Sequence, residues 1–313
     1  MKLDLKSFIK ENPLLLAPMD AVTDIGFREL CEDQGASYTC TELISVESLI
    51  RGKVPIYRYQ RRNLKINCVQ IFGSNPESFE EATKFLVKTG EADIIDINFG
   101  CPSSSVTGAD SGSILLKDPE HVEKIVKAVV KHSNVPVTAK IRLGYTSKTY
   151  LEIAKIIENA GVSLITVHGR TAKQKYSGTA NWDAIKEVYD NLSIPVIGNG
   201  DIKEEADIKK IGIYCDALMI GRAAIGNPYL FKRLSTYYKT KKIIEIDDRK
   251  QIQKDMFVKY LNKIEDVDFY KKEFKIKQQS MWFMKGVEGS KELRKNIQDI
   301  KDSKTIIEMI KKF

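Results

Sequence analysis

The chain has 313 residues, 42% hydrophobic and 29% charged, with a formal net charge of +8, a length that fits one barrel with an appendage. No stretch approaches the ~18 uninterrupted apolar residues of a membrane helix, and the first residues lack the apolar core of a signal peptide. We therefore expect a cytoplasmic protein that does not bind a membrane.

Short apolar runs alternate with amphipathic helical stretches over residues 14–223. Two of the helical stretches start with Asn75-Pro76 and Asp118-Pro119, which place proline at the first helical position. Because right-handed crossovers favour parallel pairing, the pattern predicts an α/β fold, a (β/α)8 TIM barrel. An open doubly wound sheet is less favoured, since no dinucleotide-binding glycine fingerprint follows the first run. The expected strands are the runs 14–19, 38–43, 66–73, 93–100, 137–144, 164–170, 195–201 and 217–222.

Strand signals stop after Pro228, and the rest of the chain has the pattern of helices, with polar breaks near 247–248 and 286–290. Residues 232–313 carry 22 Lys and Arg against 13 Asp and Glu, whereas residues 1–231 carry 28 against 29. This asymmetry is typical of a domain that binds a polyanion, although a solvated helical surface would also produce it. We predict a catalytic barrel domain over 1–233 and a basic helical domain over 234–313.

Cysteine and histidine are sparse: five cysteines form no Cys-x-x-Cys pair, and there are three histidines. We therefore expect no disulfide framework and no metal, and we expect the chemistry to come from a cofactor, a thiol or both. One thiol is placed to react, because Cys101 follows Asn98-Phe99-Gly100 at the end of an apolar run and Pro102 stiffens the turn. The alternative is a small buried hydrophobe, the usual state of a free cysteine.

The carboxyl ends of barrel strands converge, so residues distant in sequence become neighbours there. Lys140 is unusual among them, because its charge interrupts a strand that should be buried and therefore needs an electron-rich partner. The N1/O2 edge of a flavin ring meets that need, and Gln70 and His168 could contact the same ligand. The residues predicted at this edge, strand by strand, are Pro18, Met19 and Asp20; Gln70; Asn98 and Cys101; Lys140 and Arg142; His168 and Arg170; Asn199, Gly200 and Asp201; and Gly221 and Arg222.

Glycine-bearing turns follow the last two predicted strands, at Asn199-Gly200-Asp201 and Gly221-Arg222. Backbone amides in such turns approach an anion with no side chain in the way, and Arg222 adds a positive charge. These features predict a phosphate site, unless the two glycines serve only tight turns.

A series of short motifs runs from Leu14 to Phe231 in this order: Ala17-Pro18-Met19, Val22-Thr23-Asp24, Phe27-Arg28, Thr41-Glu42, Gln70-Ile71-Phe72-Gly73, Asp96-Ile97-Asn98, Gly100-Cys101-Pro102, Gly112-Ser113, Leu115-Leu116, Lys140-Ile141-Arg142-Leu143-Gly144, Val167-His168-Gly169-Arg170-Thr171, Tyr176-Ser177-Gly178, Asn199-Gly200-Asp201 and Met219-Ile220-Gly221-Arg222. In this order the motifs resemble the tRNA-dihydrouridine synthases. The later segments Trp282-Phe283-Met284-Lys285-Gly286 and Leu293-Arg294 also resemble the helical domain of that family.

The resemblance implies an FMN-binding barrel whose helical domain binds tRNA and which reduces the C5–C6 double bond of particular uridines, with NADPH or NADH as the electron source. It implies that Cys101 is the general acid, which protonates C5 after flavin N5 gives a hydride to C6. It assigns Asn98, Arg142 and Arg170 to the substrate, and we expect a monomer. It assigns FMN binding to Pro18, Met19, Asp20, Gln70, Lys140, His168, Asn199, Gly200, Asp201, Gly221 and Arg222.

The chain departs from the family pattern in three places. Asp20 stands where a small residue is usual, and Ser103-Ser104-Ser105 stands where a lysine often follows Cys-Pro. Lys277-Gln278-Gln279 replaces an Arg-Lys-His cluster ahead of the tryptophan. These changes leave the chemistry intact and bear on how tRNA docks.

Two other functions stay open from the sequence. A dihydroorotate-dehydrogenase-like flavoprotein would also use an FMN barrel and a Cys-Pro turn, but its small substrate needs no basic helical domain. A non-catalytic RNA-binding barrel would need neither Cys101 nor Lys140. A uracil in folded RNA must be flipped out to reach a flavin in a barrel, and a basic appendage can supply the second grip that flipping requires. Such binding should weaken with added salt.

Overall fold

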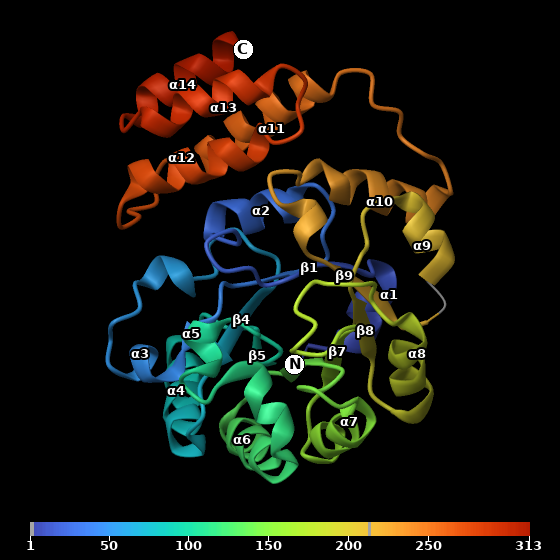
Figure 1. The fold of residues 1–313 in the computed structure, drawn as a ribbon. Coiled ribbons are helices and arrows are strands. Elements are labelled where there is room, and N and C mark those ends of the chain that lie inside the picture. The colour runs from blue at the N-terminus through green and yellow to red at the C-terminus, as the bar shows by residue number, and fades with distance from the viewer. Residues whose placement is uncertain (1–2, 212–213) are drawn as a thin grey trace.

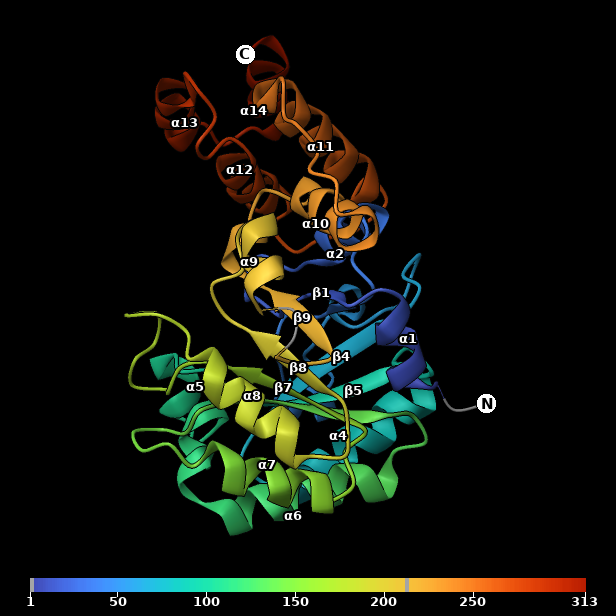
Figure 2. The ribbon, with the colours of Figure 1, turned by 90° about the vertical axis from the view of Figure 1, so that its right-hand side faces the viewer.

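The computed structural model describes residues 3–211 and 214–313. Parallel strands close into a barrel ringed by helices, and helices from the end of the chain form a bundle against one side of it (Figures 1 and 2). The strands are β1 (Leu14–Leu16), β2 (Thr39–Cys40), β3 (Ile44–Ser45), β4 (Asn67–Phe72), β5 (Ile94–Phe99), β6 (Val137–Arg142), β7 (Leu164–His168), β8 (Val196–Asn199) and β9 (Ala217–Ile220).

The strands are ordered β2-β1-β9-β8-β7-β6-β5-β4-β3, and the barrel closes because β2 also pairs with β4. The β1–β9 register places Leu14 opposite Leu218, and β5 and β6 pair in parallel from Ile95 opposite Val137 onward. The predicted (β/α)8 barrel is therefore confirmed, and an open doubly wound sheet is excluded by this closure.

Within the second predicted strand, 38–43, only Thr39–Cys40 forms a strand, β2, and a further short strand, β3, follows the predicted run at Ile44–Ser45; both pair with β4. Between them the Thr41 amide donates to the Cys68 carbonyl at 2.9 Å, and the Thr41 hydroxyl accepts the Gln70 amide at 2.9 Å. The Thr41 hydroxyl thus replaces a backbone carbonyl as the acceptor for Gln70. Regular backbone pairing with β4 stops here and begins again at Ile44. Strands β2 and β3 share one strand position of the barrel.

Helices follow the strands and cover the barrel. The expected starts of α4 and α6 are confirmed: Asn75 and Asp118 accept amides of the first turn at 2.9 and 3.0 Å, and proline occupies the first helical position. The helices around the barrel are α1 (Leu5–Glu11), α2 (Ile25–Asp33), α3 (Val46–Ile50), α4 (Pro76–Thr89), α5 (Ser104–Thr107), α6 (Pro119–His132), α7 (Tyr150–Asn159), α8 (Trp182–Asn191) and α9 (Glu205–Ile211), with 3-10 turns η1 (Ile56–Arg58), η2 (Gly112–Lys117) and η3 (Arg222–Ala224).

The chain continues through α10 (Tyr229–Thr240), α11 (Arg249–Lys263), α12 (Lys272–Phe283), α13 (Ser290–Asp299) and α14 (Ser303–Lys312). Helix α10 packs against α9, η3 and β1, whereas α11 packs against α2. The predicted domain boundary at 233/234 falls inside α10, whose Phe231 and Leu234 are both buried. None of the helices in the described part of the chain is long and apolar enough to cross a membrane.

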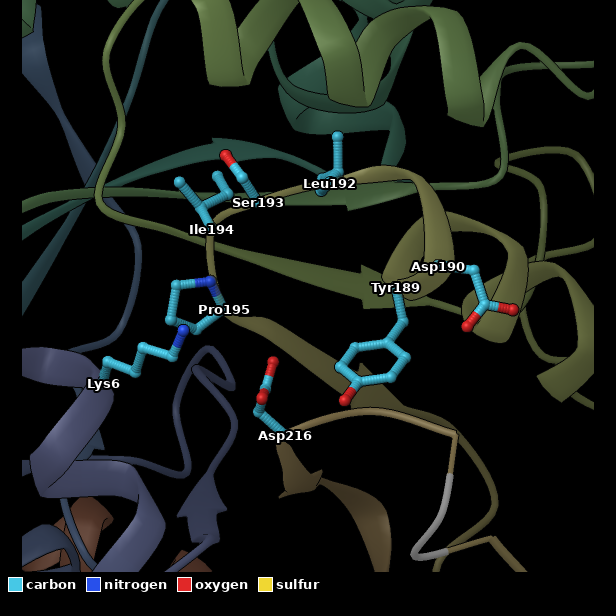
Figure 3. Close-up of a pocket in the computed structure, with 8 residues that line it drawn as sticks. All are labelled: Lys6, Tyr189, Asp190, Leu192, Ser193, Ile194, Pro195 and Asp216. Carbon is cyan, nitrogen blue, oxygen red and sulfur yellow. The ribbon is translucent and has the colours of Figure 1, made fainter.

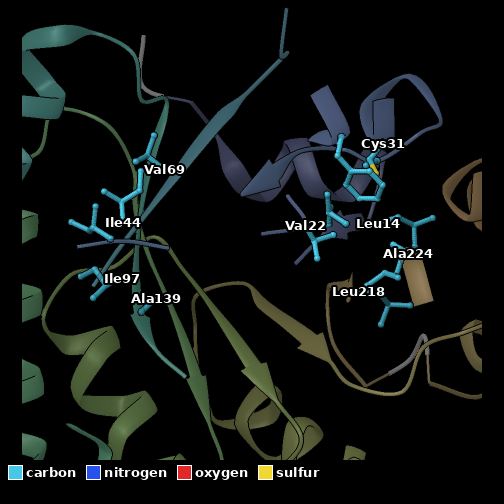
Figure 4. Close-up of a cluster of buried hydrophobic side chains, with 14 of the residues drawn as sticks. Leu14, Val22, Cys31, Ile44, Val69, Ile97, Ala139, Leu218 and Ala224 are labelled. Atoms are coloured by element: carbon cyan, nitrogen blue, oxygen red, sulfur yellow. The ribbon is translucent and has the colours of Figure 1, made fainter. Parts of the chain in front are cut away.

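One cluster of buried apolar side chains extends from the barrel strands into the helical bundle. Figure 4 shows part of it, with Leu14 and Cys31 near one end of the view and Val69 near the other. The bundle joins the cluster through α2: the rings of Phe27 and Phe283 lie 6.2 Å apart, edge to face. The barrel and the bundle therefore share a core.

Candidate active site

A cavity of about 1090 Å³ opens where the strands end at their carboxyl side. Gln70 and Arg170 lie outside its lining, behind the wall. Most of the residues predicted at the strand ends do line it: Pro18, Met19, Asp20, Asn98, Cys101, Lys140, Arg142, His168, Asn199, Gly200, Asp201, Gly221 and Arg222.

Cys101 is held by the side chain of Asn98. The Asn98 Oδ1 accepts the backbone amides of Gly100 at 3.1 Å and Cys101 at 2.9 Å, which fixes the turn after β5. Cys101 is half-buried and borders the cavity, whereas the other four cysteines are buried. Its Sγ lies 3.3 Å from the Ser103 hydroxyl, which lies 3.2 Å from that of Ser105. The thiol is thus oriented toward the cavity and joined to a short chain of hydroxyls.

Lys140 projects from β6 into the floor of the cavity. Its Nζ donates to Asn199 Oδ1 at 3.0 Å, and the Asn199 amide group donates to the Met219 carbonyl at 2.7 Å. Burial, with repulsion from Arg142, lowers the pKa of Lys140 from 10.5 to about 8. With a pKa of about 8, Lys140 is mostly charged at pH 7 and can bind an electron-rich group, and small changes in its surroundings change the fraction that is charged.

A buried polar network lies beneath this floor, centred on Asp96 of β5. The Asp96 carboxylate accepts Gln70 Nε2 at 2.6 Å and the Thr138 hydroxyl at 2.5 Å. Because Gln70 donates to Asp96, its Oε1 faces Asn98, whose Nδ2 donates to it at 2.8 Å. Burial raises the pKa of Asp96. Asp96 therefore orients Gln70 and Asn98, a role the sequence signals only by a carboxylate inside a buried strand.

The turns after β8 and β9 present positive charge to the cavity. Gly200 has φ +137°, and a Cβ there would come 2.7 Å from the Ala180 Cβ, so glycine is required. Asp201 accepts Arg170 at 2.7 Å and pairs with Arg222 at 3.4 Å. Burial opposes ionisation of Asp201, but the hydrogen bonds from Arg170 and the Ala180 amide lower its pKa below the ordinary value.

His168 is buried at the end of β7 as a neutral imidazole. Burial lowers its pKa far below the usual range, and the cations Lys140, Arg142, Arg170 and Arg222 lower it further. Among the described residues, its Nδ1 has no hydrogen-bond partner. This nitrogen is shielded from solvent, while the residue itself contributes to the cavity lining.

The two arginines predicted to bind substrate are held by backbone carbonyls. Arg142 donates to Gly100 at 2.8 Å, to Thr171 at 3.0 Å and to Lys175 at 2.9 Å. Both arginines thereby brace the loop after β7 over the cavity, since Arg170 donates to Ser177 and Gly178 of that loop at 3.0 and 2.6 Å.

Tyr176, at the tip of that loop, lines the cavity and is 53% exposed. The guanidinium of Arg222 lies 4.4 Å from the centre of its ring. The sequence marked this tyrosine only as part of a motif. The structure adds it to the cavity rim as an aromatic face backed by positive charge.

Two of the three departures from the family pattern have a structural account. Asp20 lines the cavity, but its side chain is 73% exposed and its carboxylate lies 3.9 Å from the Arg58 guanidinium. Gln279 is fully buried, and its Nε2 donates to the Val22 carbonyl at 3.1 Å and to Asp24 at 2.8 Å. It therefore contacts the barrel and presents nothing to an external partner.

A second, smaller cavity of about 290 Å³ lies at the opposite end of the barrel, where β8 and β9 begin (Figure 3). Its Asp216 carboxylate accepts the Val196 amide at 2.9 Å, which ties the two strands together. Polar groups at the amino-terminal face of such barrels serve stability, so the functional site is the larger cavity.

The fold and the site define a (β/α)8 barrel protein with a thiol and several cations around one cavity. A family model described as "Dihydrouridine synthase (Dus)" matches residues 15–312. The chain is 36% identical to a probable tRNA-dihydrouridine synthase of Aquifex aeolicus over 308 residues, 96% of each chain. It is 36% identical to the tRNA-dihydrouridine synthase B of Proteus vulgaris over 310 residues, 97% of this chain and 95% of the other. With that of Vibrio vulnificus it shares 42% over 233 residues, 72% of each.

The chain belongs to the dihydrouridine synthase family. The resemblance inferred from its motifs is confirmed.

Proposed function

We propose that the protein is a tRNA-dihydrouridine synthase that uses FMN, with NADPH or NADH as reductant, to reduce the C5–C6 bond of specific uridines. The observation that carries the proposal is the Cys101 thiol, fixed at the rim of a cation-rich cavity at the carboxyl ends of the strands. The names of the relatives support the same substrate, because each is described as acting on tRNA.

The residues present fit FMN. The cavity, about 1090 Å³, is large enough for a flavin and a uracil together. Lys140 would meet the electron-rich edge of the ring, and His168 lines the same cavity as a neutral imidazole. Gly200 and Arg222 would hold the phosphate, where backbone amides and charge favour an anion. Bound FMN would supply the hydride for C6 of the uracil.

The chain itself supplies the proton. Cys101 would give its thiol proton to C5 of the uracil as general acid, and the resulting thiolate would be reprotonated from solvent through Ser103 and Ser105. Asn98 holds the Cys101 turn, and Arg142 lies close enough to the rim to meet the base. Gln70 does not line the cavity and would act indirectly, by accepting a hydrogen bond from Asn98 that fixes its side chain.

A uridine in folded tRNA reaches this cavity only if its base is flipped out of the stack. Residues 232–313 carry the basic excess of the chain, with 22 Lys and Arg against 13 Asp and Glu. These charges would hold the tRNA backbone while the base enters the barrel. Affinity for tRNA is therefore expected to fall steeply as salt is added.

The test is the absorbance spectrum of the purified full-length protein. We expect flavin bands that bleach on addition of NADPH under anaerobic conditions and recover on addition of unmodified tRNA. Recovery with a small oxidised pyrimidine but not with tRNA would favour a metabolite dehydrogenase instead. A protein that takes up no FMN would refute the assignment, and one that binds tRNA without oxidising NADPH would be a non-catalytic RNA-binding protein.

A further inference from the structure

Helix α12 of the bundle contacts the segment that forms the β1 side of the cavity. Residues 17–20 and Val22 line the cavity, and the chain then turns into α2. Lys275 Nζ donates to the Ala21 carbonyl at 2.8 Å, and Gln279 Nε2 donates to the Val22 carbonyl at 3.1 Å. Two residues one helical turn apart thus hold consecutive carbonyls of a segment that borders the proposed flavin site.

Asp24 connects the same segment to two helices of the bundle. Its carboxylate caps α2 by accepting the Phe27 amide at 3.0 Å, and it also accepts Gln279 Nε2 at 2.8 Å and the Tyr260 hydroxyl at 3.2 Å. Lys275 lies 3.4 Å from the same carboxylate. Because Asp24, Gln279 and Tyr260 are all buried, each of these bonds would be costly to break.

The segment held in this way is strained. Ala21 has φ +62°, a left-handed conformation that is unfavourable for a residue with a Cβ. Such a conformation persists only where the surroundings fix it. The turn is closed by the amides of Val22 and Thr23, which donate to the Met19 carbonyl at 3.1 and 3.0 Å, and the Lys275 contact ties it to α12. Loss of that tie would let the turn shift relative to α12, and Pro18–Asp20 at the cavity wall would shift with it.

The same helix also supports the neighbouring part of the cavity wall, after β9, which pairs with β1. Ile225 lines the cavity after β9, and Gly226 follows it with φ +63°. A Cβ at Gly226 would come 2.2 Å from the Trp282 carbonyl oxygen at the end of α12. The loops after β1 and β9, which flank one side of the cavity, therefore rest on one helix.

We propose that Lys275 and Gln279 are positioning residues for the flavin site, although both belong to the helical bundle. They hold the Ala21–Asp24 turn and, through it, the Pro18–Asp20 wall against the ring of the cofactor. This inference rests on the proposed function. By thermodynamic linkage, a contact that improves FMN binding is itself strengthened when FMN is bound, so cofactor and bundle stabilise each other.

Gln279 uses only its amide nitrogen, since its Oε1 has no partner among the described residues. Three substitutions therefore distinguish the effect of the hydrogen-bond donor from that of side-chain size. Gln279→Met keeps the length of the side chain but has no donor, and Gln279→Glu places a carboxylate against Asp24. Gln279→His keeps a nitrogen donor. Lys275→Met removes the second contact at a side chain that is 15% exposed, and Lys275→Arg restores it. Lys272→Met is the matched control, because Lys272 is on the same helix and bonds only within the bundle, to the Glu265 carbonyl.

The experiment measures the FMN dissociation constant of each full-length apoprotein from the quenching of flavin fluorescence, together with the reduction potential of the bound flavin. We expect Gln279→Met and Lys275→Met to weaken FMN binding by up to about tenfold, because each loses hydrogen bonds to the Ala21–Asp24 turn and the part of that energy that depends on bound FMN appears in the dissociation constant. Gln279→Glu should weaken it further. Gln279→His and Lys275→Arg should recover most of the affinity, and Lys272→Met should leave it unchanged.

The outcomes separate this inference from the proposed function. If the wild-type protein binds no FMN, the proposed function fails and the inference fails with it. If the wild-type protein binds FMN and the Met variants bind it equally well, the inference alone is overturned, even where their melting temperatures fall. If Gln279→Met does not fold, Lys275→Met decides, because its side chain is less deeply buried.

Discussion

Cys101 differs from the other cysteines of the chain in its surroundings. Its amide is fixed by Asn98, its Sγ contacts the Ser103 hydroxyl, and it alone among the five is not buried. A group in this position can deliver a proton to a substrate in the cavity, whereas the buried thiols are shielded from one.

We expect Cys101→Ala to bind FMN and to be reduced by NADPH as the wild type is, but to reduce uridine about 10²- to 10⁴-fold more slowly, the usual contribution of a general acid. Single-turnover reoxidation of the reduced flavin by tRNA measures the loss directly. The matched control is Cys215→Ser, because Cys215 lies just before β9, outside the lining of the cavity, and its thiol donates to the Ala217 carbonyl. Reoxidation of Cys101→Ala at the wild-type rate would remove the general-acid role.

We expect Lys140 to make FMN binding sensitive to pH. Its pKa is lowered to about 8, so in the free protein the ammonium is present below pH 8 and lost above it. Since a flavin edge binds the charged form better, affinity should be constant below pH 8 and fall above it, by up to about tenfold per pH unit until the pKa of the complex is reached. Titration with FMN from pH 6 to 10 measures this.

The control for that titration is Lys203→Met, which removes another lysine of the cavity lining and should keep the same fall. Lys140→Met should bind FMN weakly and show no fall. A pH-independent affinity in the wild type would mean that Lys140 does not contact the cofactor.

At the level of single residues, the sequence predicted on which strand end a residue lies better than it predicted whether the side chain reaches the cavity. Lys140 and Cys101 could be identified because a charge in a buried strand and a thiol after a strand-ending glycine are visible in the chain itself. Gln70 and Arg170 were placed at the right strand ends but lie behind the cavity wall, because Asp96 and Asp201 bind their side chains. Those partners are 26 and 31 residues away, so no local pattern shows them.

At the level of elements, periodicity and turn chemistry identified the strands and the capped helices, but not the interruption of the second strand. That interruption depends on the Thr41 hydroxyl accepting an amide of the neighbouring strand, a contact between segments distant in the chain. The close packing of α12 on the barrel was equally invisible in the sequence. It depends on Gly226 and on a carbonyl of residue 282.

Two glycines test this packing. Gly226 and Gly52 both have φ +63°, but a Cβ at Gly226 would meet the Trp282 carbonyl, whereas a Cβ at Gly52 would meet nothing within 4 Å. We expect Gly52→Ala to lower the free energy of unfolding by about 1 kcal/mol through backbone strain alone. Gly226→Ala should lose about 1–3 kcal/mol more through the clash. Chemical denaturation measures both, and equal losses would show that α12 does not press on this loop.

At the level of the whole molecule, the sequence predicts a barrel domain and a helical domain. A buried cluster runs from the barrel strands through Phe27 to Phe257 and Phe283 of the bundle, so the two parts are packed together. Gly26 of α2 lies so close to α11 that a Cβ there would come 2.2 Å from Ile264 Cγ2. The helical bundle therefore covers α2, the helix that follows the first barrel strand.

We expect a protein truncated after Thr240 to lack a cooperative unfolding transition, because it exposes the α2 face that α11 and α12 cover. A truncation after residue 288 is the control, since it removes α13 and α14 but keeps α11 and α12 against α2. Calorimetry and gel filtration distinguish the two. A monomeric 1–240 protein with a sharp transition would show that the barrel is an independent domain.

The bond between Asp24 and Tyr260 joins residues 236 positions apart. A ribosome that adds about 5–20 residues per second reaches the second partner on the order of ten seconds or more after the first has emerged. During that interval α2 has left the ribosome while the helix that covers Gly26 and Phe27 has not yet been made. The apolar face of α2 is thus a foreseeable binding site for chaperones on the nascent chain, and barrel closure is expected to be a late event in synthesis.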